Sequence, residues 1–355
     1  MTPPLGIFRN KRVLVTGDTG FKGSWLAYWL HYLGANVHGF SHPPERDCDH
    51  FNVLGLARHI HHTDGEIRDY SQVREFMETT RPEFIFHLAA QPLVRKSFRE
   101  PKLTMDTNIG GTVNVLEAVR FTPSVKVLVT ITSDKCYRNK EWCWGYRESD
   151  ELGGKDPYSA SKAAAEIVYS AYQDSFFAGR PQFGAASVRA GNVIGGGDWS
   201  TDRIVPDCIR ALQSGKPIVL RNPQATRPWQ HVLEPLSGYL LLASRLYEDP
   251  AQFRGSYNFG PDSREIHTVE EVARALISVW GSGGIKIARN ESDPPEAGLL
   301  HLNCDKAHHA LGWYPRWNFA KTVERTAQWY KSVKEGTDAV ALTRRQIIEY
   351  MESSP

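Results

Sequence analysis

Short apolar runs alternate with longer amphipathic segments over the first 190 residues of the chain. Runs rich in Val, Ile, Leu and Phe predict buried strands, and apolar residues at helical spacing predict helices. The predicted strands are Arg12–Thr16, Asn36–Phe40, Ala57–His62, Phe84–Leu88, Val125–Ile131 and Phe183–Val188. The predicted helices are Phe21–Leu33, Tyr70–Thr79, Asn108–Phe121 and Pro157–Asp174. Because strands that alternate with helices favour parallel βαβ units, we expect an α/β fold with a doubly wound parallel sheet.

The pattern changes after about residue 190. A glycine-rich loop at 195–199 is followed by a short strand over Pro217–Leu220, an amphipathic helix over Val269–Trp280 and a turn at 281–284. We therefore expect a smaller C-terminal α/β lobe packed on the sheet, with a cleft between them. The sheet domain is predicted to comprise residues 1–190 and roughly 226–250. The lobe is predicted to comprise residues 191–225 and 251–335, and residues 336–355 form a C-terminal extension.

Composition excludes several classes of protein. The chain has 355 residues, 41% hydrophobic and 23% charged, with a net charge of +2, so nothing favours nucleic-acid binding. No apolar stretch approaches the length needed to span a bilayer, that at 238–243 being too short, and Met1–Pro4 lacks the features of a signal peptide. Five scattered cysteines fit a reducing compartment. We expect a cytoplasmic protein with no nucleic-acid or membrane partner.

A glycine-rich turn follows the first predicted strand. Gly17, Gly20 and Gly23 have the spacing Gly-x-x-Gly-x-x-Gly between a strand and a helix. Such glycines let backbone N–H groups approach a dinucleotide pyrophosphate at a positive helix end. The sheet therefore reads as a Rossmann-type, dinucleotide-binding domain. Its candidate cofactor residues in this turn are Gly17, Thr19, Gly20, Phe21, Lys22 and Gly23.

The end of the second predicted strand lacks the acid that usually holds the adenosine ribose. The sequence there is Phe40-Ser41-His42, so Ser41 and His42 become the candidate cofactor residues. NAD is the expected cofactor, but NADP stays an alternative because His42 or Arg46 could accept a 2′-phosphate. Glu66 and Ile67 are expected to border the adenine, with a solvated acidic turn as the alternative. The residues Leu88, Ala89 and Ala90 would let the cofactor lie close, unless they are ordinary packing.

Tyr158 and Lys162 are the candidate catalytic pair. A phenol and an ammonium four residues apart share one helix face. Free tyrosine titrates near pH ~10, and a nearby lysine is expected to lower that pKa, so that the phenolate can act as a base. Ser133, at the end of the fifth predicted strand, can orient the same substrate hydroxyl.

Asp134 and Lys135 extend this candidate site beyond simple oxidation. A second acid and a second amine beside a redox centre suggest a further proton transfer, such as an elimination. Cys136 is only a weak candidate nucleophile, because no base is paired with it by motif. The pairs His61-His62 and His308-His309 lack metal-ligand spacing and read as structural, so no metal is expected. The substrate-binding candidates are Gln91, Ser133, Asn192, Arg203 and Arg227, where arginine suits the oxygens of a diphosphate.

These motifs together resemble the extended short-chain dehydrogenase/reductases, and within them the nucleotide-sugar 4,6-dehydratases. The resemblance covers about residues 8–335. It is carried by Gly17–Gly23, His87–Gln91, Ser133–Tyr137, Tyr158–Lys162, Arg189–Trp199, Asp202–Asp207 and Arg227–Val232. The stretches Gly20–Trp25 and Arg227–Val232 imply CDP-glucose as the substrate. The lobe would accordingly bind a nucleotide sugar.

The resemblance implies oxidation at C4 of the sugar, loss of water across C5 and C6, and return of the hydride to C6. Thymidine-linked relatives use an Asp-Glu pair for the elimination, whereas the second residue here is Lys135, which leaves the identity of the C5 base open. The resemblance also implies a homodimer through a four-helix bundle built from about 103–121 and 157–174. The alternatives are a UDP- or dTDP-sugar dehydratase, a 4-epimerase, or a nicotinamide-responsive binding protein without turnover.

Overall fold

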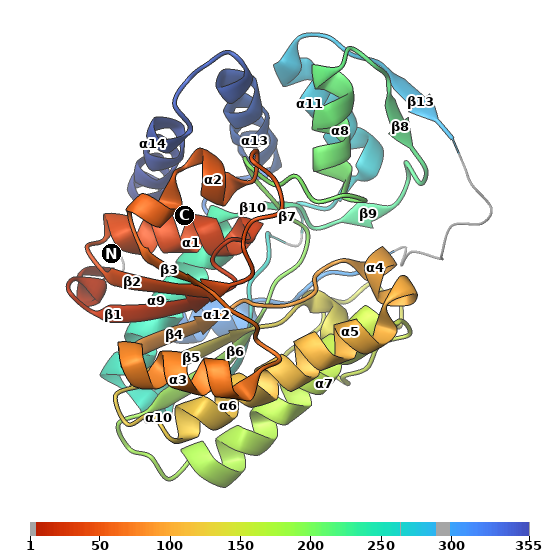
Figure 1. Cartoon of the computed structure of the whole chain (residues 1–355). Helices are drawn as coiled ribbons and strands as arrows, with labels where there is room; N and C mark the ends of the chain where they lie inside the picture. The colour runs from red at the N-terminus through yellow and green to blue at the C-terminus, as the bar shows by residue number, and fades with distance from the viewer. Residues whose placement is uncertain (1–4, 263, 289–298, 355) are drawn as a thin grey trace.

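Seven parallel strands form the central sheet of the computed structural model, which describes residues 5–262, 264–288 and 299–354 (Figure 1). Met1–Pro4 and 289–298 of the predicted lobe lie outside these residues. The strands are β1 Arg12–Thr16, β2 Asn36–Ser41, β3 His61–Asp64, β4 Phe84–His87, β5 Val127–Ile131, β6 Gly184–Arg189 and β11 Gly255–Asn258. Their order, β11-β6-β5-β4-β1-β2-β3, reverses between β1 and β4. This reversal creates the crevice where doubly wound sheets bind ligands, and it confirms the predicted fold class.

Helices cover both faces of the sheet (Figure 1). The helices are α1 Phe21–Tyr32, α2 His50–Val53, α3 Tyr70–Thr80, α4 Val94–Arg99, α5 Pro101–Met105, α6 Gly111–Arg120, α7 Pro157–Tyr172, α8 Ile204–Gln213, α9 Leu233–Glu248, α10 Pro250–Phe253, α11 Val269–Trp280, α12 Asp305–Leu311, α13 Phe319–Lys334 and α14 Ala339–Glu352. On one face lie α3, α6 and α7, and on the other lie α1 and α9. Side chains of β1 alternate accordingly: Leu14 packs toward the first face, and Val13 and Val15 toward the second.

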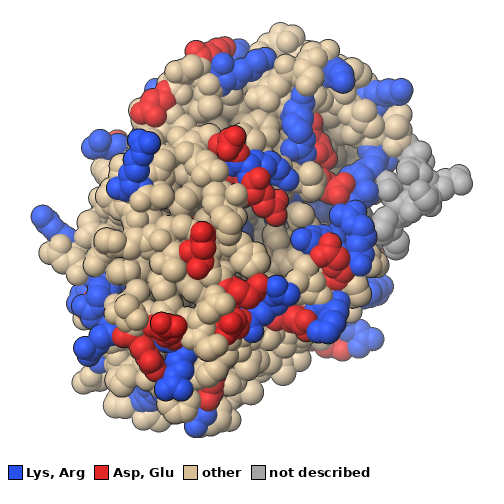
Figure 2. Space-filling model, viewed as in Figure 1, with Lys and Arg blue, Asp and Glu red and all other residues tan. Residues whose placement is uncertain are grey.

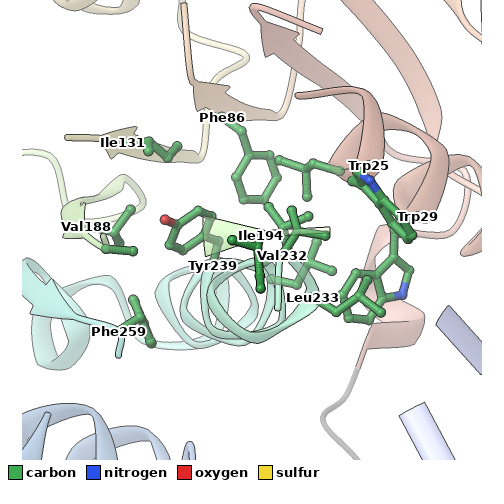
Figure 3. Packing of buried hydrophobic residues seen from close by; sticks show 14 of the residues in the cluster. Trp25, Trp29, Phe86, Ile131, Val188, Ile194, Val232, Leu233, Tyr239 and Phe259 are labelled. Carbon is green, nitrogen blue, oxygen red and sulfur yellow. The ribbon is translucent and has the colours of Figure 1, made fainter. Parts of the chain in front are cut away.

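The larger core lies between the sheet and α9 (Figure 3). Tyr239 on α9 points toward Phe86 and Ile131 of the sheet, while Trp25 and Trp29 close the core from α1. Because α9 is apolar nearly all round, it is buried along most of its length. The sequence analysis did not single out this helix.

Three short strand pairs lie above the carboxyl edge of the sheet. These pairs are β7 Val193–Ile194 with β10 Gln230–His231, β9 Thr226–Arg227 with β12 His267–Thr268, and β8 Ile218–Leu220 with β13 Ile285–Ile287. Together with α8 and α11 they build the smaller upper part of the molecule (Figure 1). The predicted strand over Pro217–Leu220 and the helix over Val269–Trp280 are both present. The residue boundaries of the two domains stay a prediction.

The chain after residue 336 folds back onto the sheet domain through a buried carboxyl group. Glu234 on α9 accepts hydrogen bonds from the backbone N–H groups of Arg316 and Trp317 and from the Tyr350 hydroxyl at 2.6 Å. Tyr350 lies on α14, which also contacts α1 and α13. The C-terminal extension is therefore an integral helix. Across the described ranges, no helix is both long enough and apolar enough to cross a membrane.

Two predicted elements differ from the observed ones. The predicted third strand over Ala57–His62 is wrong in its first half, where Leu56–Arg58 forms a 3₁₀ turn, because Gly55 adopts a left-handed φ of 55°. The strand begins only at His61, where pairing with β2 starts. The predicted helix over Asn108–Phe121 contains a π-helical turn, Asp106–Gly110, before α6. Asn108 is on this turn and faces the site described next.

Candidate active site

Two glycines of the turn, Gly17 and Gly23, pack too closely to carry a side chain. Gly17 has a φ of 75°, and a Cβ there would lie 2.8 Å from the backbone nitrogen of Ala89. A Cβ on Gly23 would lie 2.0 Å from the carbonyl oxygen of Gly17. Gly20 precedes α1 and supplies no side-chain cap to its first N–H groups. The positive end of α1 is thus available to an anion, as the predicted pyrophosphate site requires.

Thr19, Ser41 and His42 are brought together at the end of β2. Thr19 Oγ1 lies 2.9 Å from Ser41 Oγ and donates to the His42 carbonyl at 2.8 Å. His42 Nε2 lies 3.0 Å from a Glu66 carboxylate oxygen. The predicted cofactor residue Glu66 is therefore in contact with this group. Arg46 is directed elsewhere and donates to the carbonyl of Trp199 at 2.6 Å.

Ile67 and the end of β4 are also held by close contacts. Ile67 is buried, and a Cβ on Gly111 would lie 2.9 Å from its side chain. The backbone N–H of Ala89 donates to Thr16 Oγ1 at 3.2 Å, and Thr16 in turn contacts His87 Nδ1 at 2.8 Å. Burial lowers the pKa of His87 to about 3, so this imidazole is neutral and serves as an internal link.

Gln91 is held by internal hydrogen bonds. Its amide donates to Thr104 Oγ1 at 2.8 Å and to the Leu93 carbonyl, and its backbone N–H donates to Asn108 Oδ1 at 2.8 Å. Asn108 also donates to Ser161 Oγ at 2.8 Å, one residue before Lys162. The π turn that carries Asn108 therefore connects β4 to α7, a link that the sequence analysis missed. The substrate role of Gln91 stays a prediction.

Ser133 and Asp134 form a buried hydrogen-bonded pair just beyond β5. Ser133 Oγ donates to Asp134 Oδ1 at 2.8 Å and accepts from the backbone N–H of Lys135 at 3.2 Å. Asp134 is 2% exposed. A Cβ on Gly191 would lie 1.9 Å from the Asp134 carboxylate, so the loop after β6 requires glycine at this position. The structure thus fixes the candidate acid against the start of the upper lobe.

Tyr158 and Lys162 lie on the buried face of α7. The helix begins after Asp156, whose carboxylate accepts from the backbone N–H of Ser159 at 2.9 Å, as an N-cap does. Burial raises the pKa of Tyr158 to about 12, and the Asp134 charge adds to this, while the Ser133 hydrogen bond opposes it. The expectation of a lowered tyrosine pKa is therefore wrong for the protein alone, because burial outweighs its neighbours.

Lys162 lies above a buried acid. Burial lowers the pKa of this amine to about 8, and the negative charge of Glu166, one turn later on α7, opposes the shift. Glu166 accepts from Ser187 Oγ at 2.7 Å and pairs with Arg189 at 2.7 Å. The sequence places Glu166 four residues after Lys162, a helical spacing from which this contact could have been predicted.

Removing the Glu166 carboxylate is expected to destabilise the whole fold. Glu166 and Arg189 are 2% exposed, so Glu166→Ala leaves an unpaired buried guanidinium. We expect the free energy of unfolding to fall by about 3–5 kcal/mol, measured by urea denaturation. The control Glu78→Ala breaks the exposed pair with Arg74 and should leave that free energy nearly unchanged. Equal effects of the two variants would contradict a structural role for the Glu166–Arg189 pair.

Charged groups from both parts of the molecule act on Lys22. The pKa of Lys22 is lowered to about 8, chiefly by burial and then by the charges of Arg203 and Lys162, while Asp134 opposes the shift. Arg203 donates to Asp198 at 2.9 Å. The convergence of these cations favours anionic ligands in the crevice.

The remaining substrate candidates lie in the upper part of the molecule, next to β7 and on β9. Asn192 has a left-handed φ of 51°, and its carbonyl accepts from the Gln230 N–H at 3.3 Å. Arg227 lies on β9 and donates to the carbonyl of Thr226 at 2.7 Å. Figure 2 shows Lys and Arg side chains gathered around a hollow between α4 and β9. An anionic substrate is compatible with this surface.

The side chains that the sequence analysis set aside are structural here. Burial raises the pKa of the Cys136 thiol well above its usual range, which removes it as a nucleophile. His62 bonds to Asp18 and Asp64, and His308 stacks on Tyr314 at 4.5 Å. Within residues 5–262, 264–288 and 299–354, His, Cys, Asp and Glu side chains form no group that could hold a metal ion.

Comparison with known proteins agrees with this geometry. Residues 14–326 match the model of the family described as GDP-mannose 4,6 dehydratase. The chain is 46% identical to the CDP-glucose 4,6-dehydratase of Salmonella typhimurium, over 98% of each chain. The chain belongs to the GDP-mannose 4,6 dehydratase family.

Solved structures with the same fold extend the comparison. The dTDP-glucose 4,6-dehydratase of Bacillus anthracis, a complex with NAD, superposes with a TM-score of 0.76 at 23% identity, over 92% of this chain and 98% of that one. The UDP-glucose 4-epimerase of Thermus thermophilus, also a complex with NAD, has a TM-score of 0.76 at 25% identity, over 90% and 99%. Membership of the GDP-mannose 4,6 dehydratase family thus confirms the resemblance to nucleotide-sugar dehydratases within the extended short-chain dehydrogenase/reductases.

Proposed function

We propose that this protein converts CDP-D-glucose to CDP-4-dehydro-6-deoxy-D-glucose and water, with NAD as its cofactor. The observation that carries the proposal is the 46% identity to a CDP-glucose 4,6-dehydratase over 98% of both chains. Other sugar dehydratases are far less similar; the human dTDP-D-glucose 4,6-dehydratase, for example, is 24% identical. The convergence of Ser133, Asp134 and Tyr158 at one buried edge supports the same chemistry.

The residues present fit a bound dinucleotide. The uncapped start of α1 and the close glycine turn leave room and N–H donors for its pyrophosphate. Thr19, Ser41 and Glu66 would lie toward the adenosine half, and Tyr158 and Lys162 toward the nicotinamide half. When bound, NAD supplies an acceptor for the hydride from C4 and later returns that hydride to C6.

The chain's own residues divide the proton transfers. Tyr158, helped by the Ser133 hydroxyl, takes the proton of the 4-hydroxyl, and Lys162 holds a positive charge behind it. Once C4 is a ketone, the C5 proton becomes acidic. Lys135 removes that proton in its neutral amine form, and Asp134 in its protonated form donates to the departing 6-hydroxyl, which leaves as water. Asn192, Arg203 and Arg227 bind the diphosphate and so orient the sugar toward the catalytic residues.

The assignment of Lys135 predicts a selective loss of exchange at C5. Lys135→Met removes the amine but keeps the side-chain stem, so oxidation at C4 should persist while proton removal at C5 stops. In deuterium oxide we expect substrate recovered from the variant to carry no deuterium at C5, as measured by proton NMR. Lys140→Met is the control, because Lys140 pairs with Glu151 on the surface. Continued deuterium entry in Lys135→Met would assign the base elsewhere.

The proposed enzyme is a homodimer formed through α7 and the α5–α6 segment. Ile167 on α7 and Phe121 at the end of α6 are 59% and 54% exposed, which is unusual for large apolar side chains. We expect Ile167→Arg to convert the dimer to a monomer in sedimentation velocity, because it places a charge in an apolar contact. Val219→Arg, at another exposed apolar position, is the control and should leave the assembly unchanged. A monomeric unmodified protein would refute the proposal.

We also propose a cytoplasmic location, supported by the five cysteines, all of which are free.

A nucleotide-sugar panel tests the proposed function. Purified protein with NAD should convert CDP-glucose to a 4-keto-6-deoxy product, identified by NMR, without net reduction of NAD. UDP-glucose, dTDP-glucose and GDP-mannose serve as competing substrates. Conversion of one of these but not of CDP-glucose would overturn the substrate assignment, and formation of a C4 epimer would indicate an epimerase.

A further inference from the structure

A buried carboxylate lies behind the residue that takes the place of the missing second-strand acid. Ser41 ends β2, and its hydroxyl donates to Asp18 Oδ1 at 2.8 Å. Asp18 comes from the glycine turn and is 0% exposed. A Cβ on Gly39 would lie 2.0 Å from Asp18 Oδ2, so β2 leaves a space that only this carboxylate fills. An acidic group is therefore present at the end of β2, although it comes from another segment.

The hydrogen bond to Asp18 fixes the direction of the Ser41 proton. A hydroxyl has one proton and two lone pairs, and a bond to a carboxylate is stronger than one to the neutral His42 carbonyl, 3.1 Å away. On its other side Ser41 Oγ lies 3.4 Å from the Thr19 backbone nitrogen and 2.9 Å from Thr19 Oγ1, and both of these groups can donate to it. Toward the cofactor turn Ser41 is thus an acceptor. A ribose hydroxyl can donate to Ser41. A phosphate is largely ionised at neutral pH, so it is a poor donor to Ser41, and the negative charge of Asp18 repels it.

Asp18 is itself held by a histidine. His62 Nδ1 lies 2.7 Å from Asp18 Oδ2, and His62 Nε2 lies 3.0 Å from Asp64 Oδ1. Since His62 takes one carboxylate oxygen, only the other faces Ser41. This arrangement orients the carboxylate and keeps Ser41 as its second partner.

The cations near the end of β2 already have partners. His42 and Arg68 both bond to Glu66, whose pKa is lowered to about 2, chiefly by Arg68, so that it is ionised. Arg46 donates to the Trp199 carbonyl. A 2′-phosphate site normally offers an arginine to that group, and these residues would have to break existing bonds to do so.

We propose that Asp18, acting through Ser41, replaces the missing second-strand acid and makes this site select NAD over NADP. Asp18 is a positioning residue in this proposal, and Ser41 contacts the ribose. The inference rests on the proposed function, because it assumes that the glycine turn binds a nicotinamide dinucleotide. It explains from this chain's own residues why NAD is bound in preference to NADP.

Direct binding measurements test the proposal without turnover. Isothermal titration with NAD and with NADP, in the absence of sugar nucleotide, gives the ratio of the two dissociation constants. We expect the unmodified protein to bind NAD at least about tenfold more tightly, as one charge-assisted hydrogen bond provides. In Asp18→Asn the amide oxygen faces His62, so its N–H₂ donates to Ser41 and frees the serine proton for a phosphate. The preference should fall about tenfold.

Two further variants separate selectivity from damage to the fold. Ser41→Ala removes the acceptor and should lower the preference to a similar degree, and it serves if Asp18→Asn does not fold. Asp64→Asn makes the same chemical change on the other partner of His62, and it should leave the ratio unchanged. Equal weakening of both nucleotides, or an unchanged ratio in Asp18→Asn and Ser41→Ala, would overturn the inference. Binding of neither nucleotide to the unmodified protein would instead refute the proposed cofactor.

Discussion

Tyr158→Phe is expected to reduce turnover of CDP-glucose by about 10²–10⁴-fold while NAD and CDP-glucose still bind. The phenol is buried, and its pKa is affected by a hydrogen bond with Ser133 and by the charge of Asp134. Because phenylalanine keeps the ring and loses only the oxygen, the packing of α7 should persist. Steady-state rates and isothermal titration measure the two quantities separately.

The pH dependence of the unmodified enzyme bears on the same residue. The pKa of Tyr158 is raised to about 12 by burial in the protein alone, so activity should increase as the pH rises through neutrality toward the alkaline range. Tyr158→Phe should abolish that increase. Tyr169→Phe, about three turns further along α7, is the control, because it removes a buried hydroxyl away from Ser133. Unchanged turnover in Tyr158→Phe would remove this residue from the mechanism.

Asp134→Asn should separate oxidation from dehydration. The amide cannot protonate the departing 6-hydroxyl, so we expect loss of water to slow by about 10²–10⁴-fold while oxidation at C4 continues. Mixing the variant with NAD and CDP-glucose should therefore produce a lasting near-ultraviolet absorbance from bound, reduced nicotinamide, with little 4-keto-6-deoxy product. Stopped-flow absorbance and NMR measure the two outcomes.

A matched variant controls for the loss of a carboxylate near α7. Asp156→Asn makes the same change at the N-cap of that helix, where asparagine caps as well as aspartate does. Its product yield should equal that of the unmodified enzyme. A normal yield from Asp134→Asn would show that another group protonates the leaving hydroxyl.

Local sequence pattern predicted the strands and the helix on either side of the cofactor turn. It did not predict elements whose structure depends on contacts with residues distant in the sequence. The runs that became β1, β4 and β5 are mostly apolar and bounded by turn residues, which is the pattern of a buried strand. The third strand was misplaced because its residues, His61–Asp64, are polar and only their pairing with β2 makes them a strand. The apolar run of α9 has no polar face to mark it as a helix.

The candidate site shows the same division. Motif spacing identified Ser133, Asp134, Tyr158 and Lys162, because all follow a strand end or share a helix face. Their roles stay predictions, as do those of Asn192, Arg203 and Arg227. The Asp18–Ser41 bond and the Glu166–Arg189 pair each join residues that are 23 apart in sequence. A local sequence pattern cannot predict such contacts, since they depend on how neighbouring strands are ordered in the sheet.

The seventh strand of the sheet has a consequence for synthesis of the chain. β11 completes the sheet by pairing with β6, yet it is made some 65 residues later, after the first strands of the upper lobe. Until then β6 presents an unpaired edge of backbone N–H and C=O groups, which invites association between nascent chains. A fragment ending near residue 190 should accordingly aggregate, whereas one extended past Asn258 covers that edge with its own strand.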